Sequence, residues 1–390
     1  MANNKDFKVK NGIKPAAYQE AVGTATSGSV AVGYDLSVAA YDSVEFSIVS
    51  QDTSPRGMTF NNDGTKMYIV GSGNDSVFQY SLSTGFDLST ASYDSVSFSV
   101  ASQDTTPIGL SFNNDGTKMY IIGNSSNTVY QYSLSTGFNL STASYDSVSF
   151  SVSSQESSSQ DLAFNNDGTK MYIVGSGSNT VYQYSLSTGF NLSTASYDSV
   201  SFSAASQEGS VRGMTFKSDG TKMYVTGALN DSVYQYSLST AFDISTATYD
   251  NESFSLASQT TAPNGITFSD NGTKLYMVTG SGDKVFQYST GSTLATATLD
   301  LSTGSVFEVT PTANTQVSLS NPAASGTVSS STLLLSTSAT AYTITWDSSI
   351  KWSGGTAPDS PAASETDVYY FSTRDGGTSY IANIAIDGAK

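Results

Sequence analysis

The chain has 390 residues, with 16 Lys and Arg against 33 Asp and Glu and a formal net charge of −17. Nucleic acids and anionic membranes are bound through basic stripes, which this sequence lacks, so we expect neither among its partners. It contains no cysteine and no histidine, which excludes disulfides, thiolate catalysis and the commonest metal ligand and general base. No apolar run reaches the ~18 residues of a membrane span.

Residues 1–32 form a predicted N-terminal arm. The arm is rich in Ala, Gly, Ser and Thr, and it has too few apolar side chains to bury a core of its own. Its first residues lack the apolar stretch of a secretory signal peptide. We expect the arm to anchor the protein by ordering against a partner or another copy; the alternative is a plainly disordered segment.

Residues 33–290 contain a repeated unit. The motif Asn-Asn-Asp-Gly-Thr-Lys-Met-Tyr, or a close variant, recurs every 52 residues, with its turn residue at Asp63, Asp115, Asp167, Asp219 and Asn271. A fixed period of this size in strand-like sequence indicates one supersecondary unit whose copies bury their faces on each other.

The first copy of the unit reads as four short strands, near residues 57–60, 66–71, 76–82 and 93–100. An Asp-Gly turn joins the first two, because Gly64 accepts positive φ. Consecutive apolar residues from Met67 to Val70 indicate a strand that is buried on both faces. Four antiparallel strands in a unit of this size predict one blade of a β-propeller.

The order of strand types predicts how the array closes. The chain begins with a fourth strand at residues 41–49 and ends the array with a third strand at residues 284–289. We therefore expect an all-β fold in which the N-terminal outer strand completes the last blade of a five-bladed propeller. An open solenoid is the alternative, but its end copies would need to differ as caps.

The loops on one face of the disc differ between copies. The position of Arg56 is occupied by Ile108, Gln160, Arg212 and Asn264 in the later copies, and the loops between second and third strands vary around Asn230. Binding sites are usually built on loops of a rigid scaffold. The pattern predicts a ligand face with Arg56, Gln160, Arg212, Asn264 and Asn230 as candidate contacts; unconstrained drift of the loops is the alternative.

Catalysis and metal binding find less support in the sequence. Five-bladed glycosidases need paired carboxylates in the channel, whereas the innermost strands supply only Asp161, so we expect no enzyme. The repeated acids Asp52, Asp104, Glu156 and Glu208 read as turn caps, with a ring that holds Ca²⁺ as the alternative. We expect no cofactor and no metal.

Residues 291–390 lack the repeat. Short strands with a turn about every ten residues predict a small β-sandwich or jelly roll. Residues 373–380 approximate the Asp-box hairpin, a structural turn device. Trp352 is a candidate contact in this domain, as an exposed sugar platform; core packing is its ordinary role.

Several short segments, at residues 4–13, 300–307, 314–321 and 350–358, resemble parts of phage tail-fibre and virion structural proteins, especially those of marine and cyanobacterial phages. The blade resembles propeller repeats of such proteins and of bacterial surface proteins. The resemblance implies a virion protein that is assembled in the host cytoplasm, released by lysis and docked to other virion proteins through residues 1–32.

The function implied by this resemblance is a non-catalytic tail fibre or receptor-binding protein, a homotrimer that recognises a host surface polysaccharide. The alternatives are a capsid decoration or head-fibre protein without a receptor role, and a bacterial surface lectin or adhesin. A polysaccharide-degrading enzyme is the weakest reading, because it would need clustered acids in the channel.

Overall fold

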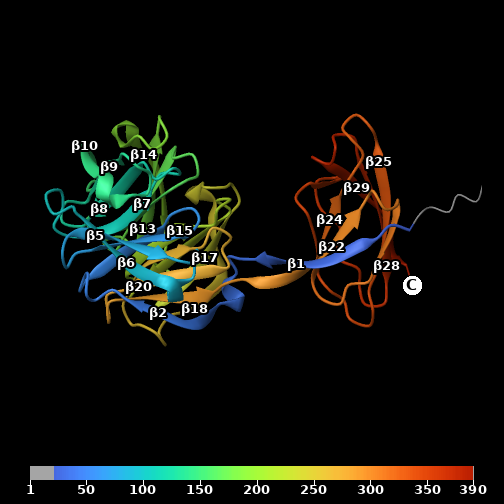
Figure 1. Ribbon diagram of the computed structural model, residues 1–390, viewed down its shortest axis with the longest axis horizontal. Coiled ribbons are helices and arrows are strands. Elements are labelled where there is room, and N and C mark those ends of the chain that lie inside the picture. Colours follow the sequence, from blue (N-terminus) through green and yellow to red (C-terminus); the bar gives the residue numbers. More distant parts are fainter. Residues whose placement is uncertain (1–21, 390) are drawn as a thin grey trace, which may run out of the picture. The chain divides into compact units, whose positions relative to one another are not determined.

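The computed structural model describes residues 22–389, and these residues are all-β apart from short 3-10 turns (Figure 1). They divide into two compact units. One unit spans Ala31–Ser292, and the other combines the described residues up to Val30 with those from Thr293 onward.

The first unit consists of five four-stranded antiparallel blades. The first three are β3 (Pro55–Phe60), β4 (Lys66–Gly71), β5 (Ser76–Leu82), β6 (Ala91–Ser99); β7 (Pro107–Phe112), β8 (Lys118–Gly123), β9 (Thr128–Leu134), β10 (Ala143–Ser151); and β11 (Ser159–Phe164), β12 (Lys170–Gly175), β13 (Thr180–Leu186), β14 (Ala195–Ser203). The last two are β15 (Val211–Phe216), β16 (Lys222–Gly227), β17 (Ser232–Leu238), β18 (Ala247–Ser255); and β19 (Pro263–Phe268), β20 (Lys274–Thr279), β21 (Lys284–Ser289), β2 (Ala40–Ser47). A 3-10 turn precedes each outer strand: η1 (Leu36–Val38), η2 (Leu88–Thr90), η3 (Leu140–Thr142), η4 (Leu192–Thr194) and η5 (Ile244–Thr246).

The ring closes through its N-terminal strand. β2 pairs antiparallel with β21, which gives the fifth blade the order β19-β20-β21-β2. The innermost strands β3, β7, β11, β15 and β19 each contact the next one around the ring, and β19 returns to β3. The predicted five-bladed propeller, closed by an outer strand from the N-terminus, is therefore confirmed.

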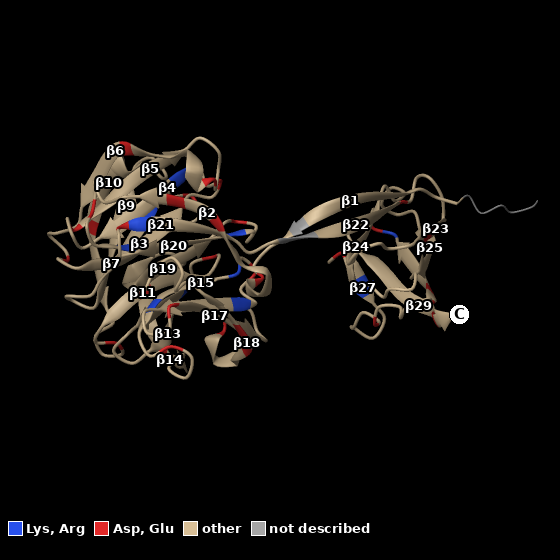
Figure 2. Ribbon diagram, turned by 90° about the horizontal axis from the view of Figure 1, so that it is seen from below, with Lys and Arg blue, Asp and Glu red and all other residues tan. Residues whose placement is uncertain are grey.

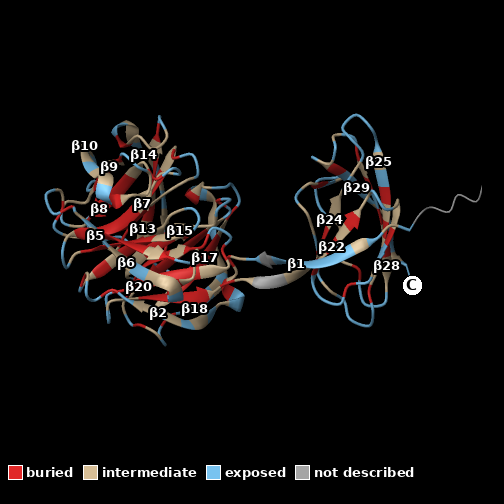
Figure 3. Cartoon of the chain, in the orientation of Figure 1, coloured by how far each residue is buried: buried red, intermediate tan, exposed pale blue. Residues whose placement is uncertain are grey.

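Packing between blades explains the apolar second strands. Met67, Tyr68, Ile69 and Val70 are fully buried, as expected where each sheet is covered on both faces. Figure 3 shows buried residues in the strands of the propeller. The outer strand β6 instead alternates half-buried with exposed residues, because only one of its faces meets the neighbouring blade.

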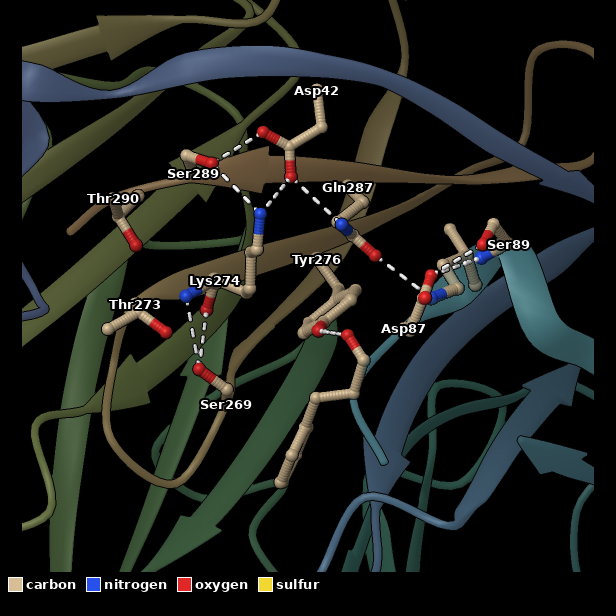
Figure 4. A network of polar contacts seen from close by, with 12 residues as sticks. Asp42, Asp87, Ser89, Ser269, Thr273, Lys274, Tyr276, Gln287, Ser289 and Thr290 are labelled. Atoms are coloured by element: carbon tan, nitrogen blue, oxygen red, sulfur yellow. Dashed lines mark hydrogen bonds and ion pairs between the residues drawn. The ribbon is translucent and has the colours of Figure 1, made fainter. Parts of the chain in front are cut away.

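A polar network fastens the closing blade (Figure 4). Asp42 of β2 accepts hydrogen bonds from Lys274 (2.6 Å), Gln287 (2.9 Å) and Ser289, at the C-terminal end of the propeller segment. The Oε1 atom of Gln287 accepts the backbone N–H of Leu88 in the first blade at 2.9 Å. The corresponding Lys–Asp pairs recur in the other blades, so this network serves the architecture.

Replacing Asp42 by alanine is expected to destabilise the propeller by about 2–3 kcal/mol, since it leaves three donors without their shared acceptor. Hydrogen bonds outweigh burial and hold the pKa of Asp42 below its ordinary value. The destabilisation caused by Asp42→Ala should therefore have its full size above pH 4 and become smaller as the pH falls below 4. Urea unfolding of Asp42→Ala at several pH values measures this.

Glu45→Ala, on the same strand, is the matched control. Its ion pair with Lys284 is exposed, with 43% of the Glu45 side chain accessible, so we expect a change within about 0.5 kcal/mol. Equal effects of the two variants would contradict the role given to Asp42.

The second unit is a β-sandwich. One sheet has the order β1-β22-β24-β26 and the other β23-β25-β28-β29-β27. The strands are β1 (Ala25–Val32), β22 (Ser292–Asp300), β23 (Val306–Val309), β24 (Thr315–Ser320), β25 (Ser329–Ser336), β26 (Ile344–Trp346), β27 (Ile350–Trp352), β28 (Thr366–Thr373) and β29 (Tyr380–Ala389). Leu299, Phe307, Leu333 and Tyr369 are fully buried in its core.

The segment expected to be an arm has two parts. Ala25–Val32 is strand β1, hydrogen-bonded to β22 in the sandwich sheet, and its residues up to Val30 are grouped with that unit. Residues 1–21 lie outside the described residues. The domain boundaries 1–32, 33–290 and 291–390 stay a prediction drawn from the sequence.

Candidate functional site

A β-bulge occurs at the same place in every innermost strand. The register shifts between Pro55 and Gly57 in the first blade, and at the corresponding point in the other four. A bulge leaves one residue unpaired and re-aims its side chain. We call the five bulged positions the bulge ring: Arg56, Ile108, Gln160, Arg212 and Asn264.

Contacts within the bulge ring join different blades. Arg212 Nη1 lies 3.5 Å from Gln160 Oε1, and Asn264 Nδ2 donates to the Pro55 carbonyl at 2.8 Å. Burial, and then repulsion from Arg212, lower the pKa of Arg56. The two arginines stand on the first and fourth blades, which are not neighbours, so this repulsion acts across the ring. The structure thus brings together four of the side chains predicted as ligand contacts.

The innermost strands approach each other closely immediately beyond the bulge ring. The next residue of each inner strand is glycine in four blades: Gly57, Gly109, Gly213 and Gly265. A Cβ atom added to Gly57 would lie 2.4 Å from the Ile108 carbonyl oxygen and 3.2 Å from the Gly109 Cα. Neighbouring backbones therefore approach too closely for a side chain, and we call this level the waist.

Asp161 occupies the fifth position of the waist. Its carboxylate accepts the backbone N–H groups of Leu162 at 2.8 Å and Met214 at 3.0 Å. Desolvation raises the pKa of Asp161 to about 7. The residue also lines a cavity of about 190 Å³ whose wall includes Thr59, Ser111, Thr215 and Thr267. Asp161 can therefore exchange a proton near neutral pH inside the channel.

The repeated acids hold the loops around the bulge ring. Asp52 is buried and accepts the backbone N–H groups of Ser54 (2.6 Å), Gly73 (3.2 Å) and Asn74 (3.0 Å). Asp104, Glu156 and Glu208 make the same kind of contacts in their blades. Their oxygens serve as turn acceptors, and residues 22–389 contain no cluster of three or more ligating side chains that could hold a metal.

The remaining two candidates lie apart from the bulge ring. Asn230 is exposed, and its side-chain amide donates to the Gln207 carbonyl at 2.7 Å, which fastens its own loop. Trp352 packs edge-to-face on Trp346, with ring centroids 4.9 Å apart, beside the core of the sandwich. These contacts give both residues structural roles, and we leave them out of the site.

A groove of about 590 Å³ lies between the fifth and first blades, next to the network in Figure 4. It is lined by Asp87, Lys274 and Gln287, among others. A groove of about 460 Å³ has the equivalent lining between the second and third blades. Because the lining repeats with the blades, we attribute these grooves to the architecture and favour the bulge ring, where the repeat breaks.

The sequence identified the variable residues of the ring. It did not predict the β-bulges that bring these side chains together. It also missed the positions sixteen residues further along the chain, which contact the ring: Ser72 accepts from Arg56, and Ser176 from Gln160. The only signal was a second variable position in phase with the first. Elsewhere on the propeller, Lys and Arg are few and dispersed among more numerous acids (Figure 2).

No family model matches the chain, and no curated protein does. Solved structures with some similarity include a β-propeller domain and proteins named as gluconolactonases or 6-phosphogluconolactonases. A Bacteroides uniformis protein named as a candidate 6-phosphogluconolactonase is 14% identical, with a TM-score of 0.39, over 58% of this chain and 64% of that one. The periplasmic gluconolactonase of Pseudomonas aeruginosa is 14% identical, with a TM-score of 0.35, over 50% and 52%. In both comparisons the aligned part covers less than two thirds of this chain and less than two thirds of the other protein.

These findings contradict the resemblance to phage proteins. The similar structures are gluconolactonase-like and other propeller proteins, so the predictions of a tail fibre and of a virion location were wrong. The motifs that carried the resemblance are segments of eight to ten residues, and such short local patterns are shared by proteins with unrelated roles.

The prediction that the protein is not an enzyme is also contradicted, because several of the similar structures are named as lactonases. A single carboxylate at Asp161 excludes only the paired-carboxylate chemistry of glycosidases. The described part of the chain holds no helix with the length and apolarity of a membrane span.

Proposed function

We propose that the propeller is a binding module that takes a small polar molecule at the bulge ring, in the mouth of its channel. The observation that carries this proposal is a break in symmetry. Five equivalent bulged positions carry Arg, Ile, Gln, Arg and Asn, whereas the waist beside them is nearly uniform.

Burial argues against loop drift as the explanation of this variation. Gln160 and Asn264 are only 6% and 7% exposed, and burying a polar side chain costs free energy unless it is fully paired. The second blade has Ile108 at the same position, also 6% exposed. An apolar side chain is therefore compatible with the scaffold, and the polar ones support a role in recognition.

A thermal-shift screen against neutral sugars, sugar acids, sugar phosphates and amino acids tests the proposal. We expect at least one class to stabilise the protein, by about 2.7 kcal/mol at a concentration a hundred times its Kd. The stabilisation should be lost when Arg56, Gln160, Arg212 and Asn264 are all replaced by isoleucine, the residue that the second blade carries. Ligands that bind should also be assayed for turnover, since Asp161 can exchange a proton near neutral pH.

Lys217→Asn is the matched control, because Lys217 lines the cavity on the other side of the waist and Asn165 stands at its position in the third blade. Binding should survive this change. A ligand whose binding survives the fourfold replacement, or a screen with no ligand at all, would overturn the proposal. If the fourfold variant fails to fold, the four single replacements provide the same comparison.

A further inference from the structure

The charge of the bulge ring is unusual for this protein. The chain has three arginines and a net charge of −17, yet two of the three arginines, Arg56 and Arg212, stand in the ring and repel each other. Among residues 22–389, every ion pair is made by a lysine. Two positive groups are therefore held together without a carboxylate in ion-pair contact with either.

The nearest acid does not compensate them. Asp52 attracts Arg56 and raises its pKa, but this effect is smaller than burial and the repulsion from Arg212. The carboxylate of Asp52 is committed to three backbone N–H groups of its own loop. Neither guanidinium group therefore has Asp52 as an ion-pair partner.

Hydrogen bonding distinguishes the two arginines. Arg56 Nε donates to Ser72 Oγ at 3.3 Å, and Gln160 uses the equivalent Ser176 at 3.0 Å. The fourth blade has Ala228 at this position, which offers no acceptor. Accordingly, Arg212 Nε is buried without a hydrogen-bond partner, and the contact of Nη1 with Gln160 is long, at 3.5 Å.

A buried donor without a partner and two close cations both cost folding free energy. An oxyanion would relieve both, because the guanidinium fork presents parallel N–H groups that match carboxylate or phosphate oxygens. We propose that the molecule bound at the bulge ring carries a carboxylate or phosphate group, which is held between Arg56 and Arg212. This inference rests on the proposed function and names the chemistry of its ligand.

Calorimetric titration of the full chain with inorganic phosphate and with acetate tests this assignment, with uncharged glycerol as the reference. We expect one or both anions to bind and glycerol not to bind. Arg212→Gln should weaken anion binding at least about tenfold; glutamine at the same position in the third blade makes this a compatible replacement. Arg212→Lys keeps the positive charge but lacks the forked guanidinium group. We expect its anion affinity to lie between those of the native protein and of Arg212→Gln.

Salt provides a second readout, because added sodium chloride should weaken an electrostatic site. Binding of phosphate alone or acetate alone would decide which oxyanion the ring prefers. Absence of binding by both anions, or binding that is unchanged in both Arg212→Gln and Arg56→Gln, would overturn the inference. If an uncharged molecule binds the ring independently of Arg212 and of salt, this inference fails while the proposed function stands.

Discussion

Replacing Asp161 by glycine is expected to abolish a loss of stability that the native propeller suffers as the pH rises from 4 to 8. Desolvation raises the pKa of this carboxyl from 3.8 to about 7 in the folded chain. The unfolded chain therefore releases the proton first, and the folded state becomes less stable as the pH rises through the folded pKa. At about 1.4 kcal/mol per pKa unit, the effect reaches up to about 4 kcal/mol.

The measurement is the free energy of unfolding of both proteins, by urea titration, at closely spaced pH values. Glycine is the residue of the other four waist positions, so the scaffold accepts it, although the two backbone N–H groups lose an acceptor. The variant should be the less stable protein at pH 4 and the more stable one at pH 8. Parallel curves across this range would mean that Asp161 is ionised in the folded protein.

Adding a methyl group to a glycine of the waist should destabilise the propeller at every pH. Gly57→Ala places a Cβ atom 2.4 Å from the Ile108 carbonyl oxygen. Because this oxygen belongs to the backbone of the next blade, relief requires a shift of a whole inner strand. We expect a destabilisation of about 3 kcal/mol, measured as the loss in urea midpoint.

Gly265→Ala is the matched control at the same level of the channel. Its added Cβ would lie 3.0 Å from the Arg56 carbonyl oxygen, a milder overlap, and we expect a loss of about 1 kcal/mol. Asp161 shows that one blade already tolerates a side chain here. If Gly57→Ala proves as stable as Gly265→Ala, the waist is not set by the close approach of backbones.

The fold could be predicted from the sequence because the same four-strand pattern recurs in five copies. A single blade such as residues 57–100 would be ambiguous, but copies in phase reveal which residues belong to turns and which to buried strands. The outer strand near Tyr41 has no three preceding strands of its own blade to pair with. It therefore already required closure with the last strands of the repeat array. The structure confirms that closure in the pairing of β2 with β21.

The same regularity limited what could be predicted about the site. Variation at Arg56 and its counterparts was visible, but the bulge that turns these side chains into one ring depends on hydrogen bonds between strands. Asn230 varies as well and lies outside the ring, because its amide is used within its own loop. Sequence variation alone cannot separate these two situations.

Function was harder still, because it was inferred from brief turn-rich segments and not from a site. Segments such as residues 300–307 form turns and strand ends of the sandwich, and such local structure is shared by proteins with unrelated roles. The bulge ring, in contrast, combines buried polar side chains, two mutually repelling arginines and a buried Arg212 N–H group without a hydrogen-bond partner.

The position of a bound ligand tests this account most directly. We would determine the crystal structure of the protein with the tightest ligand from the thermal-shift screen. The account predicts that the ligand lies in the channel mouth, within hydrogen-bonding distance of at least two bulge-ring side chains, with its charged group between Arg56 and Arg212. A ligand in an interblade groove or on the sandwich, with the ring empty, would contradict it.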